Sequence, residues 1–314
     1  VLPAAAIAPG NRETLNRQLD PARRPPTLSR RLPADPDRAT DRASLDKTKF
    51  PPGLGSAKKG TAAEPARVRV EHLKPLREHD ESMDLLGFTA AALTEARVPA
   101  PIARALVLCK RTAFQKPDNG ARDIATSDVF RRLVTRPLAQ QLAVQLAAAT
   151  APFQFALTTR AGTDCAATLP RSKLDHDDHT VIVSIDGVGG EGVEQGGSLA
   201  PALFALALHG ALVGASRTLE QGDFLVAFLD DVYIKTTRAT ARAAVDTTTG
   251  AIHLRANVYC HLGKSWADNK GGGSPGKQLL RDSNAAVHNP LGRRQLDAGL
   301  KALDGLADEP RDKS

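Results

Sequence analysis

The sequence predicts an α+β fold, and three observations support that prediction. The run TVIVSI at 180–185 is short, apolar and β-branched, as a buried strand is, and Asp186 follows it. Two more apolar runs, at 224–229 and 232–235, are separated only by Asp230 and Asp231, which predicts a hairpin. Sequences with helical spacing lie around these strands, and such mixing is typical of α+β proteins. Helices are expected at 83–96, 101–110, 128–149, 198–216 and 239–246.

The first 65 residues are expected to form a disordered basic tail, because nine of the 21 prolines fall within the first 52 positions and the apolar residues are mostly alanine and isolated leucine. Its arginine pairs could touch nucleic acid, or could simply be solvated. The folded domain is expected at 66–268. Residues 269–314 are expected to hold a Gly-rich linker (269–276) and a weak helix at 293–306.

Local signals mark the remaining elements. Pro101 suits the first turn of a helix, and the segment from Lys116 to Arg122 (KPDNGAR) has the composition of a tight turn between two strands. Asp128 is a candidate N-cap for the helix that follows, and Pro137 should kink that helix or split it in two. A short extended segment is expected near Leu262.

The overall composition narrows the classes of function. The net charge is +7 and the pI is near 9.5, which suits a polyanionic partner such as nucleic acid. Three widely spaced cysteines form neither a disulfide framework nor a CxxC metal site, which favours buried thiols in a reducing compartment. No apolar run reaches the ~20 residues that cross a bilayer, and no basic segment precedes an apolar N-terminal run. We therefore expect an intracellular protein, nuclear or cytoplasmic, that is neither membrane-bound nor secreted.

The strongest local feature is VAFLDDVYIK at 226–235. Two adjacent carboxylates, Asp230 and Asp231, occupy a turn in which Asn-Gly or Asp-Gly would be easier. A cation would neutralise their repulsion, and Mg²⁺ prefers such hard oxygen ligands. Asp186, after its own apolar strand, could join them around two metal ions. The alternative is an ordinary turn with solvated carboxylates.

The order of these motifs resembles the reverse transcriptase domain of eukaryotic non-LTR (LINE-type) retrotransposons, over about residues 85–268. The pieces that carry the resemblance are KPDNGARDI, DVFRRLVTR, PFQFALTTRAGTDC, VIVSIDG, GVEQGGSLAPALFALALH, AFLDDVYI and HLGKS. The resemblance implies a right-hand palm and fingers, with a small antiparallel palm sheet packed by helices. It also implies RNA-directed DNA polymerase activity, with an RNA template, a DNA primer and deoxynucleoside triphosphates as partners; it identifies no protein partner.

The resemblance also assigns roles to residues. Asp186, Asp230 and Asp231 would be the catalytic carboxylates that hold two Mg²⁺ (or Mn²⁺) ions. The remaining positions would bind the nucleotide: two cations of the fingers, a Gln-Gly pair of the nucleotide and template pocket, and a lysine near the pyrophosphate. These are Lys116, Arg122, Gln195, Gly196 and Lys264.

The chain departs from the family pattern between Asp186 and Gln195. Only eight residues (187–194) lie there, whereas the family has an Ala-Phe-Asp continuation and a helix, and Gln-Gly-Asp-Pro is replaced by Gln-Gly-Gly-Ser. An internal palm deletion is the simplest explanation. The alternative function is therefore a catalytically inactive remnant that binds nucleic acid through its basic charge. A metal-dependent nuclease built on the same carboxylates is a third option, which no further acidic cluster supports.

Three other patterns are set aside. The sequence GKS at 263–265 lacks the upstream glycine of a phosphate-binding loop, because Val258 stands at that position. The cluster LDHDDHT at 174–180 favours a solvated loop over a metal site. GVGGEGVEQGG does not match a dinucleotide-binding turn.

Overall fold

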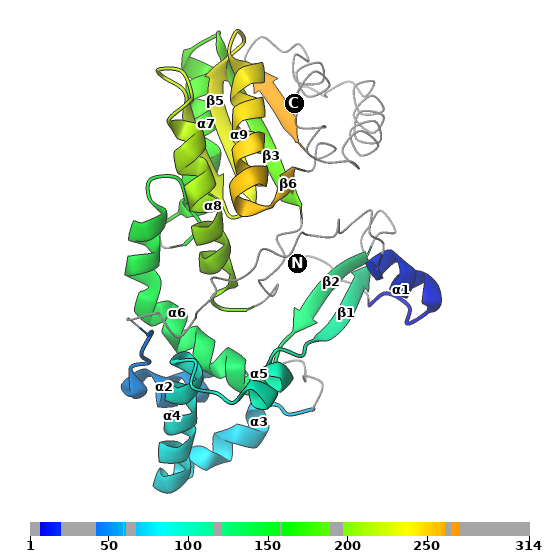
Figure 1. The fold of residues 1–314 in the computed structure, drawn as a ribbon, viewed down its shortest axis with the longest axis vertical. Coiled ribbons are helices and arrows are strands. Elements are labelled where there is room, and N and C mark those ends of the chain that lie inside the picture. The colour runs from blue at the N-terminus through cyan, green and yellow to red at the C-terminus, as the bar shows by residue number, and fades with distance from the viewer. Residues whose placement is uncertain are drawn as a thin grey trace, which may run out of the picture. The chain divides into compact units, whose positions relative to one another are not determined.

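The computed structural model has a mixed α+β architecture, as the sequence predicts (Figure 1). It describes residues 7–19, 42–58, 60, 67–115, 121–157, 159–188, 197–260 and 265–269. Contacts divide the chain into two compact units: unit 1 comprises residues 1–144 and 192–200, and unit 2 comprises residues 145–191 and 201–314. A single folded domain was expected at 66–268, and no pattern in the sequence indicates a division near residue 144, where one helix continues from the first unit into the second.

Unit 1 is mainly helical. Its two strands pair antiparallel, with Lys110 opposite Thr126 and Gln115 opposite Ala121. The N-cap expected at Asp128 is confirmed, because its Oδ1 accepts a hydrogen bond from the Arg131 amide at 2.9 Å. In order, the elements are α1 (Arg12–Leu19), η2 (Lys47–Lys49), α2 (Phe50–Ser56), α3 (Val70–Leu73), η3 (Lys74–Glu78), α4 (Asp80–Thr94), α5 (Ala100–Leu106), β1 (Lys110–Gln115), β2 (Ala121–Thr126) and α6 (Val129–Thr150), which ends in unit 2.

Part of the segment that was expected to be a disordered tail is folded. Leu45, Phe50 and Leu54 are almost fully buried in the core of unit 1, together with residues of α4 and α6. The ring of Phe50 meets that of Phe130 edge to face at 6.1 Å. The expectation of disorder up to residue 65 is therefore wrong for residues 42–58. The proline content did not reveal that a few large apolar side chains of this segment pack against residues of α4 and α6.

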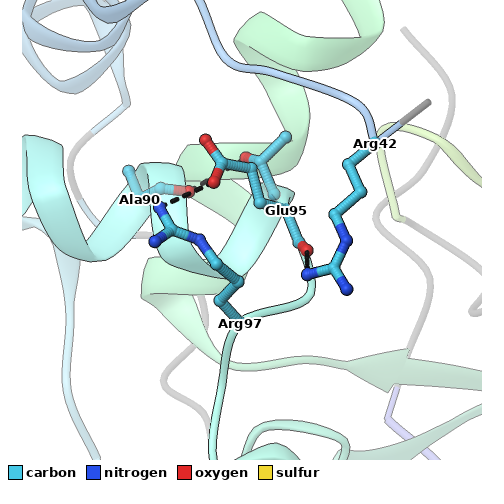
Figure 2. Close-up of polar contacts among 5 residues, drawn as sticks. Arg42, Ala90, Glu95 and Arg97 are labelled. Carbon is cyan, nitrogen blue, oxygen red and sulfur yellow. Dashed lines mark hydrogen bonds and ion pairs between the residues drawn. The ribbon is translucent and has the colours of Figure 1, made fainter. Parts of the chain in front are cut away.

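The C-terminal end of α4 is held by polar contacts of its own unit (Figure 2). Thr94 Oγ1 donates to the carbonyl oxygen of Ala90 at 2.9 Å, and the guanidinium of Arg42 donates to the carbonyl oxygen of Glu95 at 3.2 Å. Arg97 forms an ion pair with the Glu95 carboxylate at 2.6 Å. The Arg42 contact satisfies the carbonyl group of the C-cap residue Glu95, which has no intrahelical donor, and it fixes Arg42 of the folded part of the expected tail.

Unit 2 is built on an antiparallel sheet in the order β4-β5-β3-β6, with β7 also paired to β3 (Figure 1). The predicted hairpin is confirmed, with Phe224 opposite Lys235 and Phe228 opposite Asp231. Its turn was expected at Asp230 and Asp231 but lies one residue earlier, so that Asp231 is the first residue of the second strand. The predicted strand at 180–185 continues past Asp186 to Val188, because β5 pairs with it as far as Asp186 and β6 then pairs with Gly187 and Val188. The elements are α7 (Gly162–His176), β3 (Thr180–Val188), α8 (Ala200–Ser216), β4 (Phe224–Phe228), β5 (Asp231–Thr237), α9 (Ala241–Ala256), β6 (Tyr259–Cys260) and β7 (Trp266–Asn269).

One face of this sheet carries the core. Val183, Leu225 and Ile234 pack against Leu212 of α8 and Val245 of α9 in a single buried cluster. Figure 1 shows α9 across this face. Successive residues of a strand point to opposite faces, so Asp186 and Asp231, which are offset by an odd number from these core positions, point to the other face.

Helix α7 was not expected from the sequence; it begins at Gly162 and contains Pro170, two residue types that disfavour a helix interior. It contacts β3, β4 and β5, and its buried Ala166 and Pro170 are not members of the core cluster beneath α8 and α9. We infer that α7 covers part of the second face of the sheet.

Several element limits differ from the expectations. Helix α6 is continuous, so Pro137 does not split it, and α9 runs ten residues further than predicted, to Ala256. The segment expected to be extended around Leu262 is bracketed by β6 and β7, while Leu262 itself is outside the described residues. The expected helix at 293–306, and the expected linker beyond Asn269, also lie outside them.

Candidate carboxylate site

The β4–β5 hairpin turns through only two residues, Leu229 and Asp230. Leu229 has a φ of 56°, in the left-handed region that glycine, asparagine and aspartate adopt far more easily than leucine. Such a conformation costs on the order of 1–3 kcal/mol and persists only where neighbouring contacts impose it. The turn that presents the two adjacent aspartates is therefore held by its surroundings.

The register of β3 and β5 brings two of the predicted site residues together. Asp186 lies directly opposite Asp231 in the antiparallel ladder, and directly opposed side chains lie on the same face with Cβ atoms about 4.5–5.5 Å apart. Both residues are half-buried, and the Oδ2 atom of Asp186 is buried. Asp230, at the turn, is exposed.

The main chain of Asp230 is also tied to β3. The amide of Gly187 donates to the Asp230 carbonyl oxygen at 3.1 Å. A Cβ atom at position 187 would lie 3.3 Å from that oxygen and 3.2 Å from Cγ1 of Val258, which is tighter than ordinary van der Waals contact. The glycine after Asp186 thus lets the aspartate turn approach β3 closely.

The other edge of β3 adds a hydroxyl and a thiol. Ser265 Oγ, which is buried, accepts a hydrogen bond from the Asp186 amide at 3.4 Å. Cys260 lies opposite Gly187 in the ladder with β6. Burial raises the pKa of the Cys260 thiol to about 12, and the negative charge of Asp186 adds to the shift. Cys260 is therefore a buried, neutral thiol, as expected, whereas Cys109 and Cys165 are only partly buried and do not meet the expectation of buried thiols.

Two aromatic side chains lie beside the carboxylates on the same face. Tyr233 and Trp266 flank Ser184 on opposite sides, and their ring centroids are 6.5 Å apart in an edge-to-face arrangement. Burial raises the pKa of the Tyr233 hydroxyl, and the charge of Asp231 contributes. The sequence analysis did not identify these residues. Only the two-residue period from Asp231 to Tyr233 could have indicated one of them.

Of the five nucleotide-binding residues that the family resemblance suggests, one belongs to unit 1 and four lie outside the described residues. The main chain of Arg122 lies in β2 of unit 1, opposite Phe114. Lys116, Gln195, Gly196 and Lys264 are outside the described residues. For these five side chains the assigned roles stay predictions.

The capacity of the site for a metal ion rests on two carboxylates. Within the part of the chain that the structure describes, no group of three or more His, Cys, Asp or Glu side chains could hold a metal ion. Mg²⁺ commonly uses one or two protein carboxylates and takes its other ligands from water and substrate phosphates. Asp186 and Asp231 fit that type of donor set, whereas the described geometry does not add Asp230 to it.

The histidine and aspartate cluster before β3 serves another purpose. Asp177 Oδ1 accepts from the His179 amide, and Oδ2 accepts from the Thr180 hydroxyl, both at 2.9 Å. These hydrogen bonds lower the pKa of Asp177, with the His179 amide as the largest cause. The cluster builds the turn that starts β3.

Comparison with known proteins gives no assignment: no protein-family model matches the sequence, and the search of curated proteins produced no significant match. Among the helices that the structure describes, none has the length and apolar character needed to cross a membrane.

Proposed function

We propose that this chain is a shortened reverse transcriptase domain, which would extend a DNA primer on an RNA template. One observation carries the proposal: the alignment of Asp186 with Asp231 across β3 and β5, next to a two-residue turn that contains Asp230. Like charges directly opposite each other destabilise a sheet. An acidic pair kept at that position is best explained by a cation that the pair binds.

In this proposal each residue has a defined task. The carboxylates of Asp186 and Asp231 bind the divalent cation, which when bound neutralises charge on the transferring phosphoryl group. Gly187 allows the main chain of Asp230 to lie against β3, so that the turn stays beside Asp186. The basic excess of the chain attracts the template and primer.

The second candidate is a nucleic-acid-binding remnant without polymerase activity. Two observations favour it: the eight-residue spacing between Asp186 and Gln195, and the absence of a three-carboxylate group among the described residues. The basic charge would then act alone, with binding that weakens steeply with salt and is indifferent to sequence.

Primer extension on an RNA template separates the two candidates. The full chain is assayed with Mg²⁺ and with Mn²⁺, beside Asp231→Asn and the matched control Asp178→Asn, which changes an exposed aspartate at the other end of β3. Polymerase function predicts incorporation that falls by at least about 100-fold in Asp231→Asn and persists in the control. Salt-sensitive binding without incorporation supports the remnant. Incorporation that is unchanged in Asp231→Asn would contradict the proposed site.

A further inference from the structure

Gln154 holds both backbone polar groups of Leu229. Its Oε1 accepts from the Leu229 amide at 2.7 Å, and its Nε2 donates to the Leu229 carbonyl oxygen at 3.5 Å. Gln154 is only 9% exposed, so these hydrogen bonds are largely protected from competition with water. Leu229 is the residue with the unfavourable positive φ, which identifies Gln154 as a contact that imposes this conformation.

The main chain around Gln154 is fixed to the hairpin as well. The Ala227 amide donates to the Phe153 carbonyl oxygen at 2.8 Å, and the Phe155 amide donates to the Ala227 carbonyl oxygen at 2.9 Å. Gln154 thereby forms a parallel bridge with Ala227 on the outer edge of β4. This pairing sets the glutamine two residues away from the turn, within reach of Leu229.

The next element fixes the other side of this segment. A Cβ atom at Gly162 would lie 2.0 Å from the Phe155 carbonyl oxygen, so the first turn of α7 can approach the segment only because residue 162 is glycine. The segment from Phe153 to Phe155 is thus held between β4 and the start of α7.

We propose that Gln154 is a positioning residue for the carboxylate site. By holding Leu229 in the left-handed conformation, it sets the start of β5 and thereby the place of Asp231 opposite Asp186. The role rests on the proposed function, since it concerns the same cation site. It deepens that proposal by naming a residue that neither touches the cation nor belongs to the acidic motif.

The chain contains a matched control for this role. In unit 1, Gln141 makes the same kind of double contact: its Oε1 accepts from the Asp46 amide at 2.9 Å, and its Nε2 donates to the Ser44 carbonyl oxygen at 2.7 Å. Methionine has nearly the shape of glutamine but forms neither hydrogen bond. Gln154→Met and Gln141→Met therefore remove equivalent contacts, one beside the carboxylates and one in the other unit.

The test measures Mn²⁺ binding to the full chain by electron paramagnetic resonance, and amide hydrogen exchange at Leu229. We expect Gln154→Met to weaken Mn²⁺ binding by at least about tenfold, as loss of a supporting hydrogen bond commonly does at metal sites. Exchange at Leu229 should rise by roughly fivefold or more, since one hydrogen bond contributes about 1 kcal/mol. Gln141→Met should change neither quantity, and Asp231→Asn should abolish Mn²⁺ binding.

The same substitution is also measured in a Leu229→Gly variant, which separates the role of Gln154 at Leu229 from a general loss of stability. Leu229→Gly removes the steric cost of the positive φ, so adding Gln154→Met to it should weaken Mn²⁺ binding by less than about threefold, a non-additivity expected for contacting residues. Full Mn²⁺ affinity in Gln154→Met, with none in Asp231→Asn, would overturn the role of Gln154 while leaving the proposed site intact. Equal losses in Gln154→Met and Gln141→Met would overturn the role too. Absence of Asp231-dependent binding in the unsubstituted chain would remove the proposed function itself.

Discussion

Both ends of the sheet in unit 2 are acidic, yet the two ends use their carboxylates differently. At the end where β3 begins, Asp177 accepts hydrogen bonds from His179 and Thr180, and Asp223 accepts one from the Thr236 hydroxyl at 3.0 Å. We call this the capped end. At the end where β5 begins, the ladder sets Asp186 directly opposite Asp231; we call this the carboxylate end.

The difference lies in what faces each carboxylate: amide and hydroxyl donors face Asp177 at the capped end, whereas a second carboxylate lies opposite Asp186 at the carboxylate end. The capped end has local donors within a few residues of Asp177, so its charge is already stabilised by the fold. At the carboxylate end, two like charges lie opposite each other. The turn beside them contains Leu229 in an unfavourable left-handed conformation and approaches Gly187 closely. Removing a carboxylate charge should therefore stabilise the fold at the carboxylate end and destabilise it at the capped end.

The largest loss of stability is expected at Gly162, which packs against the segment that supports the carboxylate end. Gly162→Ala would set a methyl group 2.0 Å from the Phe155 carbonyl oxygen, and we expect it to destabilise the chain by about 3 kcal/mol or more through overpacking. Urea unfolding measures the effect. Gly210→Ala is the control, because it lies in α8 with nothing within 4 Å and should stabilise by about 0.5–1 kcal/mol. Equal effects of the two substitutions would contradict the close contact between Gly162 and the Phe155 carbonyl group.

Thiol reactivity reports on the interior of the carboxylate end. Cys260 is buried, with a pKa raised to about 12, whereas Cys109 and Cys165 are partly exposed. At pH 8, Cys260 should react with an aromatic disulfide at least about 1,000-fold more slowly than an ordinary thiol, since the thiolate is the reactive form. Asp186→Asn should lower the pKa of Cys260 by removing the second cause of its shift. Rapid labelling of all three cysteines in the folded chain would contradict this.

Charge removal should distinguish the two ends directly. Without a divalent cation, Asp231→Asn should stabilise the fold by up to about 1 kcal/mol at pH 7, because like charges no longer oppose each other. Asp177→Ala should instead lower the melting temperature, since the turn loses both of its hydrogen bonds. Thermal unfolding in the presence of a chelator makes the measurement. Destabilisation by both substitutions would remove the contrast on which the proposed function depends.

The smallest effects concern the pH dependence of stability at the capped end, where the pKa of Asp177 is lowered and that of Asp223 is raised. The pKa of Asp177 is lowered by its hydrogen bonds, chiefly with the His179 amide, so its contribution to stability is present above the unfolded-state pKa near 4 and is lost as pH falls through the folded value. Burial raises the pKa of Asp223 despite the Thr236 hydroxyl, so its contribution is present below pH 4 and is lost as pH rises through the folded value. The measurement is the free energy of unfolding from pH 3 to 6. Asp177→Asn should reduce the loss of stability at acid pH, and Asp223→Asn should remove the loss of stability that accompanies rising pH. Identical changes in the two variants would contradict these assignments.

The strongest sequence patterns predicted the central elements of the fold. The β-branched run before Asp186 and the two runs around Asp230 are short and apolar, so strands and a hairpin were the natural interpretation, and the structure confirms them. Helix α7 was not predicted, and its Gly162 and Pro170 are residue types that disfavour a helix interior. In the fold, Gly162 leaves room for the Phe155 carbonyl oxygen, and Pro170 is buried within α7.

The candidate site was predictable only in part. Its acids stand out because adjacent aspartates are unusual near a hairpin turn, but the opposition of Asp186 and Asp231 depends on the register of β3 against β5, which no local pattern indicates. Gln154 acts across 75 residues of sequence, and no local pattern reports such a contact. Trp266 and Ser265 lie at the site because β7 pairs with β3. A strand of only four residues is too short to be predicted from its sequence pattern.

The most direct test of the account is the effect of Mg²⁺ on thermal unfolding of the full chain and of Asp186→Asn and Asp231→Asn. At ten times the dissociation constant, bound Mg²⁺ should stabilise the folded chain by about 1.4 kcal/mol. We predict that Mg²⁺ raises the melting temperature of the unsubstituted chain, and that either substitution abolishes the rise. A rise of equal size in all three proteins, or none in the unsubstituted chain, would contradict a cation site at Asp186 and Asp231.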